Sequence, residues 1–213
     1  MIGIKKRVKT LAVETDATSF KCAVFKGLGH GAEITMMCGF SLLAASWDVI
    51  NQKIVEITRA HKIDPANVVG CLPRNQVTVR NLRLPSTDPD EIKQMFELQA
   101  AKQTPYAADQ ILSDYYLIGS SHADYSNIML VVAHQQAVNE QLRILQEAGL
   151  KPQNLSLSTA DSATWVAREL YPPGHKETQA QTVVVMDVDA EDTDFFIMNN
   201  EQLLFTQNIS IGA

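Results

Sequence analysis

The stretch that decides the fold is Leu11-Ala-Val-Glu-Thr-Asp-Ala-Thr-Ser-Phe-Lys-Cys-Ala-Val-Phe25. Apolar residues alternate with small or polar ones on both sides of an acidic turn, a pattern that predicts two half-buried strands. The turn returns late in the chain, because Glu14-Thr-Asp-Ala17 is matched by Asp187-Val-Asp-Ala190, also between two apolar strands. A repeated strand-turn-strand unit predicts two related half-domains.

The composition is that of a globular chain with one or two domains. It has 213 residues, 46% of them hydrophobic, and a net charge of −6. The basic residues cluster only at Lys5-Lys6-Arg7 and Lys9, so we expect no nucleic-acid-binding face. The cysteines are odd in number and lack Cys-x-x-Cys spacing, which predicts reduced thiols in a cytoplasmic protein.

The sequence shows neither of the usual signals for insertion into a membrane or secretion. No apolar run approaches the roughly 20 residues that a membrane-spanning helix needs, and the N-terminus does not read as a signal peptide. We therefore expect any membrane association to depend on a partner.

The periodicity predicts the remaining elements. A third strand is expected at 32–40, a helix from Ser46 to about 64, and a short buried strand at 68–73. The next stretch predicts the order strand-helix-strand-strand-helix-strand over 77–158, which is typical of a ferredoxin-like module. A further helix, a linker and three strands are expected at 158–170, 171–181 and 183–188, 193–199 and 202–210.

The sequence resembles the PilM family, the actin-like cytoplasmic proteins of type IV pilus assembly. Beyond the opening stretch, the resemblance is carried by Cys71-Leu-Pro-Arg-Asn-Gln-Val-Thr-Val-Arg-Asn-Leu-Arg-Leu-Pro85, Lys102-Gln-Thr-Pro-Tyr106 and Glu147-Ala-Gly-Leu-Lys-Pro152. It runs from about residue 5 to the end. FtsA-like division proteins and GspL-like secretion scaffolds are similar in architecture.

The resemblance implies an α/β, actin-like fold. Two RNase H-like halves would enclose a nucleotide cleft, with a small ferredoxin-like or SHS2-type subdomain inserted in the first half. The first half would comprise 1–76 and 159–180, and the inserted subdomain 77–158. The segment 181–213 would supply only the first three strands of a truncated second half.

The resemblance also implies a scaffold function in type IV pilus or type II secretion-like assembly. The expected partner is the N-terminal tail of a PilN-like inner-membrane protein, and an assembly ATPase is a further candidate. The chain would then lie in the cytoplasm, held peripherally on the inner membrane by that partner.

Two nucleotide loops follow from the same resemblance. Actin-like loops use Asp-x-Gly because glycine lets backbone N–H groups approach the phosphates. Here Asp16 and Asp189 occupy the glycine positions and Glu14 replaces the first aspartate. The implied loop positions are Glu14, Asp16, Ala17, Thr18, Ser19, Lys21, Asp187, Asp189 and Ala190.

These departures predict degenerate loops with no catalytic residue, no metal site and no cofactor, ATP with Mg²⁺ being disfavoured. The alternative is an actin-like ATPase or an RNase H-like metal-dependent hydrolase that uses Glu14, Asp16, Asp187 and Asp189.

The strand after residue 76 is the predicted docking site for the partner. It combines apolar residues with arginines that a purely internal strand would not tolerate, so an extended peptide could gain both burial and charged hydrogen bonds there. The candidate residues are Leu72, Arg74, Val77, Arg80, Leu82 and Leu84. The alternative interpretation is a sheet with one solvated face.

The last three strands predict self-association. They carry Val184, Phe195, Ile197 and Leu204 without the helices that would normally cover them. A three-stranded sheet is stable only if one face is packed, so we expect it to fold onto the first half or onto another copy.

Overall fold

The computed structural model describes residues 8–15, 19–27, 32–41, 47–122, 124–152, 154–170 and 182–213. The chain divides into two compact units, Met1–Pro73 with Asn139–Ser158, and Arg74–Val138 with Thr159–Ala213. Each unit is described by itself. The domain division expected from the sequence stays a prediction.

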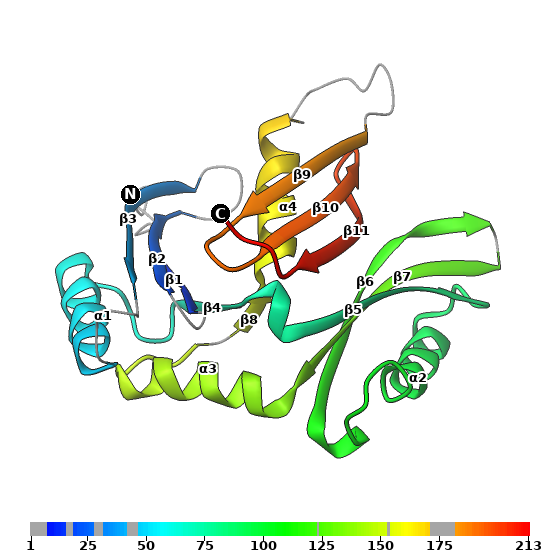
Figure 1. Cartoon of the computed structure of the whole chain (residues 1–213), viewed down its shortest axis with the longest axis horizontal. Helices are drawn as coiled ribbons and strands as arrows, with labels where there is room; N and C mark the ends of the chain where they lie inside the picture. Colours follow the sequence, from blue (N-terminus) through cyan, green and yellow to red (C-terminus); the bar gives the residue numbers. More distant parts are fainter. Residues whose placement is uncertain are drawn as a thin grey trace, which may run out of the picture. The chain divides into compact units, whose positions relative to one another are not determined.

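The first unit is built on a five-stranded mixed sheet (Figure 1). Its strands are β1 (Lys9–Thr15), β2 (Ser19–Lys26), β3 (Glu33–Ser41), β4 (Val68–Leu72) and β8 (Asn154–Leu157). Their order is β3-β2-β1-β4-β8. The first three strands form an antiparallel meander, while β4 runs parallel to β1 and β8 parallel to β4. The two predicted strands of the opening stretch are therefore confirmed as an antiparallel pair.

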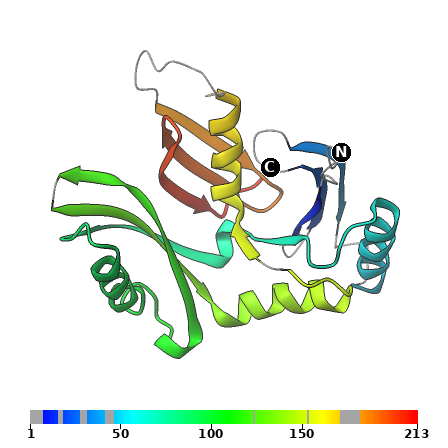
Figure 2. The same cartoon turned by 180° about the vertical axis from the view of Figure 1, so that it is seen from behind.

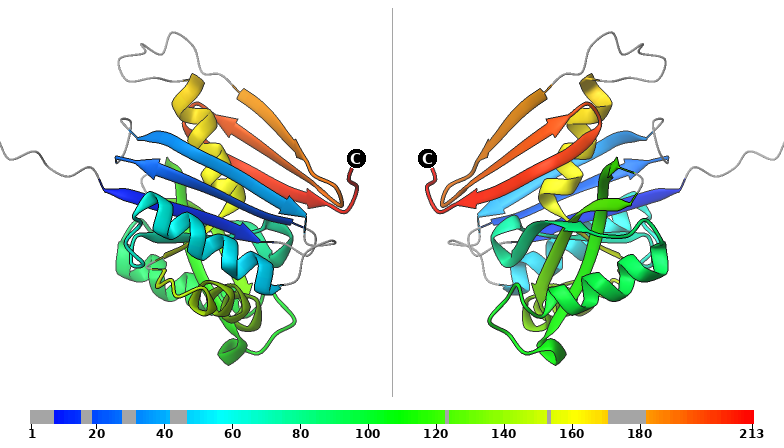
Figure 3. Two further views of the ribbon diagram at one scale, coloured as in Figure 1. Left: turned by 90° about the vertical axis from the view of Figure 1, so that its left-hand side faces the viewer. Right: turned by 90° about the vertical axis from the view of Figure 1, so that its right-hand side faces the viewer.

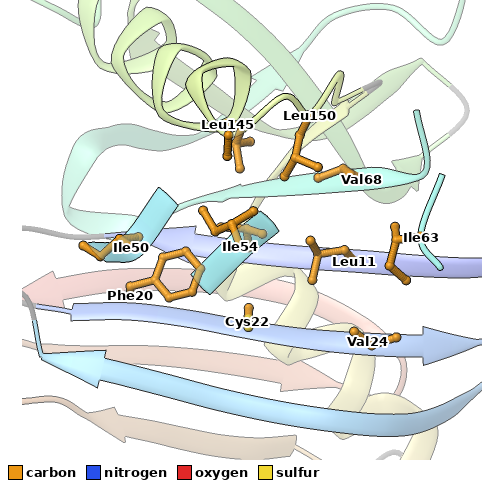
Figure 4. Close-up of a cluster of buried hydrophobic side chains, with 12 residues drawn as sticks. Leu11, Phe20, Cys22, Val24, Ile50, Ile54, Ile63, Val68, Leu145 and Leu150 are labelled. Atoms are coloured by element: carbon orange, nitrogen blue, oxygen red, sulfur yellow. The ribbon is translucent and has the colours of Figure 1, made fainter. Parts of the chain in front are cut away.

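The core of this unit lies between the sheet and two helices, α1 (Trp47–His61) and α3 (Gln135–Glu147). Alternate residues of β1 and β2 point into it, among them Leu11 and Phe20 (Figure 4). Ile50 and Ile54 of α1 pack on them at helical spacing, and Leu145 of α3 joins the same cluster. The period-two and period-3.6 patterns of the sequence thus meet in one core.

The second unit begins with the inserted subdomain. It comprises a short 3₁₀ turn η3 (Arg74–Gln76), β5 (Val77–Leu84), α2 (Pro89–Ala100), a second 3₁₀ turn η4 (Ala108–Gln110), β6 (Ile111–His122) and β7 (Tyr125–His134). The strands form an antiparallel sheet in the order β5-β7-β6 (Figure 2). Asp88 caps α2 by accepting hydrogen bonds from the backbone N–H groups of Asp90 and Glu91, as the sequence predicts.

For the predicted six-element module over 77–158, the assignment of its last helix and last strand is wrong. Strand β8 pairs in parallel with β4 of the first unit, and the part of α3 from Asn139 on belongs to that unit. Within the described residues α2 packs on the β5-β7-β6 sheet, and β11 (Gln202–Ile209) contacts β5 and β6. The parallel pairing of β8 with β4 joins residues that are distant in sequence, which the local pattern does not reveal.

The three late strands are confirmed as β9 (Thr182–Val188), β10 (Thr193–Asn199) and β11. They form an antiparallel sheet in the order β11-β10-β9. Helix α4 (Ser158–Leu170) crosses one face of it, where Ala163 and Ala167 pack on Phe196 and Met198 (Figure 3).

The expectation that no helix covers this sheet is therefore wrong for one face. On the opposite face Val184 is exposed, whereas Phe195 and Ile197 are half-buried. Leu204, the fourth residue of that expectation, is half-buried as well. Among the described helices, none has the length and apolar character required to cross a membrane.

Candidate functional site

The first acidic turn follows a strand whose end is held by α3. The buried hydroxyl of Thr15 donates a hydrogen bond to Oε1 of Gln141, and the Gln141 amide donates to the carbonyl oxygen of Cys71 at 3.3 Å. Glu14 and Lys21 lie directly opposite each other on β1 and β2, and Ser19 begins β2. The predicted loop positions Asp16, Ala17 and Thr18 lie outside the described residues.

A cavity of about 450 Å³ opens on the sheet beside Glu14 and Lys21. Its other lining residues are apolar or small: Ala12, Val13, Cys22, Ala23, Met37, Cys38, Gly39 and Cys71. The cavity thus offers a single carboxylate and a single amine on an apolar floor. Within the described ranges, no three histidine, cysteine or acidic side chains are placed to hold a metal ion.

One of the cysteines beside this cavity, Cys22, is unreactive because of its environment. Cys22 and Cys38 lie opposite each other on β2 and β3, and neither they nor Cys71 form a disulfide. Burial, and then the hydrogen bond with Cys38, raises the pKa of Cys22 to about 12. Because the thiolate is the nucleophilic form, Cys22 is inert at neutral pH.

The second acidic turn uses its own backbone donors internally. The N–H of Asp189 donates to the carbonyl of Asp192 at 2.9 Å, and the N–H of Ala190 donates to Oδ1 of Asp189 at 3.1 Å. The carbonyl of Asp189 accepts from the N–H of Ala213 at 3.1 Å. A phosphate group would have to displace these contacts. Asp187 is exposed at the end of β9.

Residues 211–213 also lie against this turn. A Cβ added to Gly212 would lie 2.2 Å from the carbonyl oxygen of Ala190, so only glycine fits there. The hydroxyl of Thr193 donates to the carbonyl of Ile211 at 2.6 Å and fixes the same segment. Residues 211–213 therefore fill the space along the turn.

Most of the predicted docking residues are buried. Leu72, Val77 and Leu84 lie in the core, and Leu82 is half-buried against the α2 cluster. Arg74 is only 6% exposed, whereas Arg80 is exposed. Their role in docking stays a prediction, with Arg80 and Leu82 as its accessible part.

The guanidinium of Arg74 ties β5 to β11. It donates through Nη1 to the carbonyl of Val77 at 2.9 Å, and through Nε and Nη2 to the hydroxyl and carbonyl of Thr206, both at 3.2 Å. Burial lowers the pKa of Arg74, and the negative charge of Asp194 partly opposes this shift.

Asp194 completes this polar cluster at the start of β10. Its carboxylate accepts from Nδ2 of Asn208 at 2.8 Å and from the hydroxyl of Thr159 at 3.3 Å. Burial raises the pKa of Asp194 more than these hydrogen bonds and Arg74 lower it.

A second cavity, of about 200 Å³, lies beside β6 and was missed by the sequence reasoning. It is lined by Tyr116, Leu117, Ile118, Met129, Ala160, Ala163, Thr164, Glu201, Gln202 and Leu203. These residues come from β6, β7, α4 and the segment 201–203 at the start of β11, which are distant in sequence. One signal was present, since Ala160, Ala163 and Thr164 put small side chains on one helical face.

Comparison with known proteins now identifies the family. The model of the family "Type IV pilus assembly protein PilM" matches residues 7–213. The chain belongs to the PilM family. Comparison of the sequence with curated proteins finds no match.

Solved structures are similar to this chain in fold. A PilM-PilN type IV pilus biogenesis complex contains a chain with TM-score 0.78 and 19% identity, covering 97% of this chain and 62% of that one. The present chain thus spans less than two thirds of that chain's length. The cytoplasmic domain of EpsL, an inner-membrane component of the type II secretion system of Vibrio cholerae, matches with TM-score 0.58 and 9% identity over 95% of this chain and 71% of that domain's chain.

A protein of unknown function with an actin-like ATPase fold, from Bacteroides thetaiotaomicron, has TM-score 0.56 and 8% identity over 100% of this chain and 74% of its own. The actin-like α/β fold expected for a PilM relative is therefore confirmed.

Proposed function

We propose that this chain is a pilus-assembly scaffold that docks the N-terminal tail of a PilN-like inner-membrane protein and does not turn over ATP. The observation that carries the proposal is the family match over residues 7–213, joined to the likeness with a chain from a PilM-PilN complex. Docking would place the chain on the cytoplasmic face of the inner membrane.

The inserted subdomain is the proposed docking region. Of the residues predicted there, Arg80 and Leu82 are accessible, and Arg80 is not engaged by the core as Arg74 is. An exposed arginine beside a half-buried leucine can contact a flexible segment without a rearrangement of the core. The four buried residues would then act only by holding the strand in place.

Calorimetry with the tail tests the docking. A synthetic peptide of the cytoplasmic tail of a PilN-like protein should bind, and a scrambled peptide of the same composition should not. Absence of binding by the tail would contradict the proposed function.

We further propose that the nucleotide loops do not bind ATP tightly. The second turn keeps the N–H groups of Asp189 and Ala190 in internal hydrogen bonds. Each aspartate at a glycine position adds charge, and a carboxylate about 5 Å from one phosphate charge costs about 3 kcal/mol at an effective dielectric constant of about 20. That cost corresponds to roughly two orders of magnitude in affinity.

Calorimetry with ATP and Mg²⁺ should detect no micromolar binding. The variant Asp16→Gly/Asp189→Gly should gain affinity, because it removes both charges and frees the backbone to approach the phosphates. Micromolar binding by the unmodified chain would overturn the proposal, and would favour the ATPase or hydrolase alternative built on Glu14, Asp16, Asp187 and Asp189.

A further inference from the structure

Basic side chains that are distant in sequence gather at one edge of the sheet of the first unit. The parallel strands β1 and β4 start at this edge, and β2 ends there. The end of α1 lies there too, since Nζ of Lys9 donates to the carbonyl of His61 at 2.8 Å. The segment after α3 follows, because the N–H of Lys151 donates to the carbonyl of Pro65 at 2.8 Å. This basic edge carries five described cations, which are Lys9, Lys26, Arg59, Lys62 and Lys151.

Most of this charge is available to a ligand. Arg59, Lys62 and Lys151 are exposed, and none of them forms an ion pair within the part of the chain that the structure describes. Lys9 and Lys26 stand directly opposite each other on β1 and β2. Like charges in that position repel each other, so an anion at the edge would relieve a repulsion that the sheet itself maintains.

The nearby carboxylates neutralise only part of this charge. Two of them lie at the basic edge, Glu33 opposite Lys26 and Asp64 in the turn after α1. Acidic side chains on the two adjoining helix ends already pair with cations outside the edge, in the ion pairs Glu56–Lys53 and Glu147–Arg143. The basic edge is therefore positive on a chain whose net charge is −6.

The sequence places three more cations next to this edge. Lys5-Lys6-Arg7 directly precede Val8, and three residues span at most about 11 Å when fully extended. Val8 is 42% exposed, and its carbonyl accepts from the N–H of Gly27 at the end of β2. Eight of the 18 lysines and arginines thus lie at the edge or within reach of it, against two of the 24 acidic residues.

Anionic lipid is the ligand that this charge distribution fits. Clusters of about four to eight lysines and arginines bind anionic headgroups through the surface potential of the bilayer. Nucleic acid fits less well, because the chain outside the edge is strongly acidic and would repel a long polyanion. The exposed aromatic side chains that the structure describes, on which bases could stack, all belong to the second unit.

We propose that the basic edge of the first unit binds the anionic headgroups of a lipid bilayer directly. Each lysine or arginine near the surface contributes about fivefold to the affinity, and the attraction falls off within a Debye length of about 8 Å at physiological ionic strength. The contact is electrostatic and reversible. It goes beyond the proposed function, because it requires no partner protein.

Vesicle flotation tests the proposal on the whole chain with no peptide present. The chain should float with vesicles made of equal parts of phosphatidylglycerol and phosphatidylcholine, and should stay behind with vesicles of phosphatidylcholine alone. Salt at about 0.5 M should release it, because the Debye length becomes shorter than the reach of the lysine side chains. Equal binding to the two kinds of vesicle, or binding to neither, would overturn the proposal.

The edge itself is tested by Lys62→Gln/Lys151→Gln. The matched control is Lys93→Gln/Lys102→Gln, which removes the same charge from exposed positions of the second unit. The first variant should bind anionic vesicles about thirtyfold more weakly, and the control should differ from the parent by less than about twofold. Equal losses in the two variants would show that net charge alone is responsible, and no loss in either would place the contact elsewhere. Both results would overturn the proposal.

Two further results separate the possible ligands and the two proposals. A DNA duplex that displaces the chain from anionic vesicles at equal phosphate concentration would identify the edge as a nucleic-acid-binding face and overturn the lipid site. Failure of vesicle binding together with binding of the PilN-like tail would overturn the lipid site and leave the proposed function standing. Vesicle binding without binding of the tail would do the reverse.

Discussion

A buried arginine joins the inserted subdomain to the late strands. The guanidinium of Arg74 donates hydrogen bonds to the carbonyl of Val77 and to two oxygens of Thr206, and the residue is only 6% exposed. A charge in this position is tolerated only because its donors are satisfied and Asp194 lies near enough to oppose the shift of its pKa. The residue therefore links β5 and β11 at the cost of desolvating a cation.

Replacing Arg74 by alanine should lower the free energy of unfolding by about 2–4 kcal/mol, because it leaves buried acceptors unsatisfied. Arg80→Ala is the matched control, and should change stability by less than about 0.5 kcal/mol since Arg80 is exposed. Urea unfolding followed by circular dichroism measures both. A loss at Arg80 as large as that at Arg74 would contradict the structural assignment.

The Asp194 carboxyl predicts a pH dependence. Its pKa is raised in the folded chain, chiefly by burial, so the folded state holds this proton more tightly than the unfolded state does. The free energy of unfolding should therefore lose a contribution as pH rises from the ordinary pKa of aspartate, about 4, through the raised value. Asp194→Asn should flatten this fall in stability.

The measurement is urea unfolding at a series of pH values, with Asp109→Asn as the control on an exposed carboxyl of η4. The control should keep the slope of the parent chain. A parallel curve for Asp194→Asn would show that this carboxyl does not titrate differently in the two states.

At the scale of elements, local patterns decided most of what could be predicted. Asp88-Pro89 predicted the start of α2, and the alternation of apolar and polar residues on both sides of Glu14 predicted β1 and β2. Helix caps and half-buried strands depend on neighbouring residues, so the sequence reveals them. The pairing of β8 could not be predicted from local sequence, because Val69 of β4 and Asn154 of β8 are distant in the chain and meet only through a parallel crossover. The cavity beside β6 escaped for the same reason, because four separate segments line it.

At the site, the main feature that the sequence analysis did not predict is the burial of most of the proposed docking residues. The arginines after residue 72 look alike in sequence, yet Arg74 lies on the 3₁₀ turn under β11 and Arg80 lies on an exposed position of β5. No periodicity within the strand predicts which arginine a distant strand will cover.

Strand β4 packs so tightly on its neighbours that one glycine is required. A Cβ on Gly70 would lie 2.5 Å from Cδ2 of Leu155 on β8 and 3.0 Å from Cδ1 of Leu145 on α3. Gly70→Ala should therefore lower the free energy of unfolding by about 1–3 kcal/mol through overpacking. Gly39→Ala is the control on the same sheet, because its nearest neighbour would be 3.6 Å away, an ordinary contact.

Thermal unfolding of both variants checks this point. The midpoint should fall for Gly70→Ala and remain close to that of the parent for Gly39→Ala. A neutral Gly70→Ala would mean that the two leucine side chains move aside without loss.

At the scale of the whole molecule, an apolar sheet face remains open. Val184, Met186 and Val188 are 55%, 64% and 52% exposed, and all three point to the side of the β11-β10-β9 sheet away from α4. Phe205 and Ile209 continue the same face, and Phe205 contacts Phe195 with ring centroids 6.3 Å apart. Contiguous exposed apolar surface of this kind marks an interaction site in soluble proteins.

We predict that this face causes self-association of the chain. Burying it against a second copy removes apolar surface from water, and β9 adds an unpaired edge in the described sheet that can align the two copies. Light scattering at micromolar concentration should show a dimer or larger species for the parent. Met186→Lys should restore the monomer, because a lysine buried in the contact would lose its hydration without a partner. Leu98→Lys on α2 is the matched control, since Leu98 is 63% exposed but lies on another element, and it should leave association unchanged. A monomeric parent, or equal effects of the two lysines, would show that the face stays open in solution.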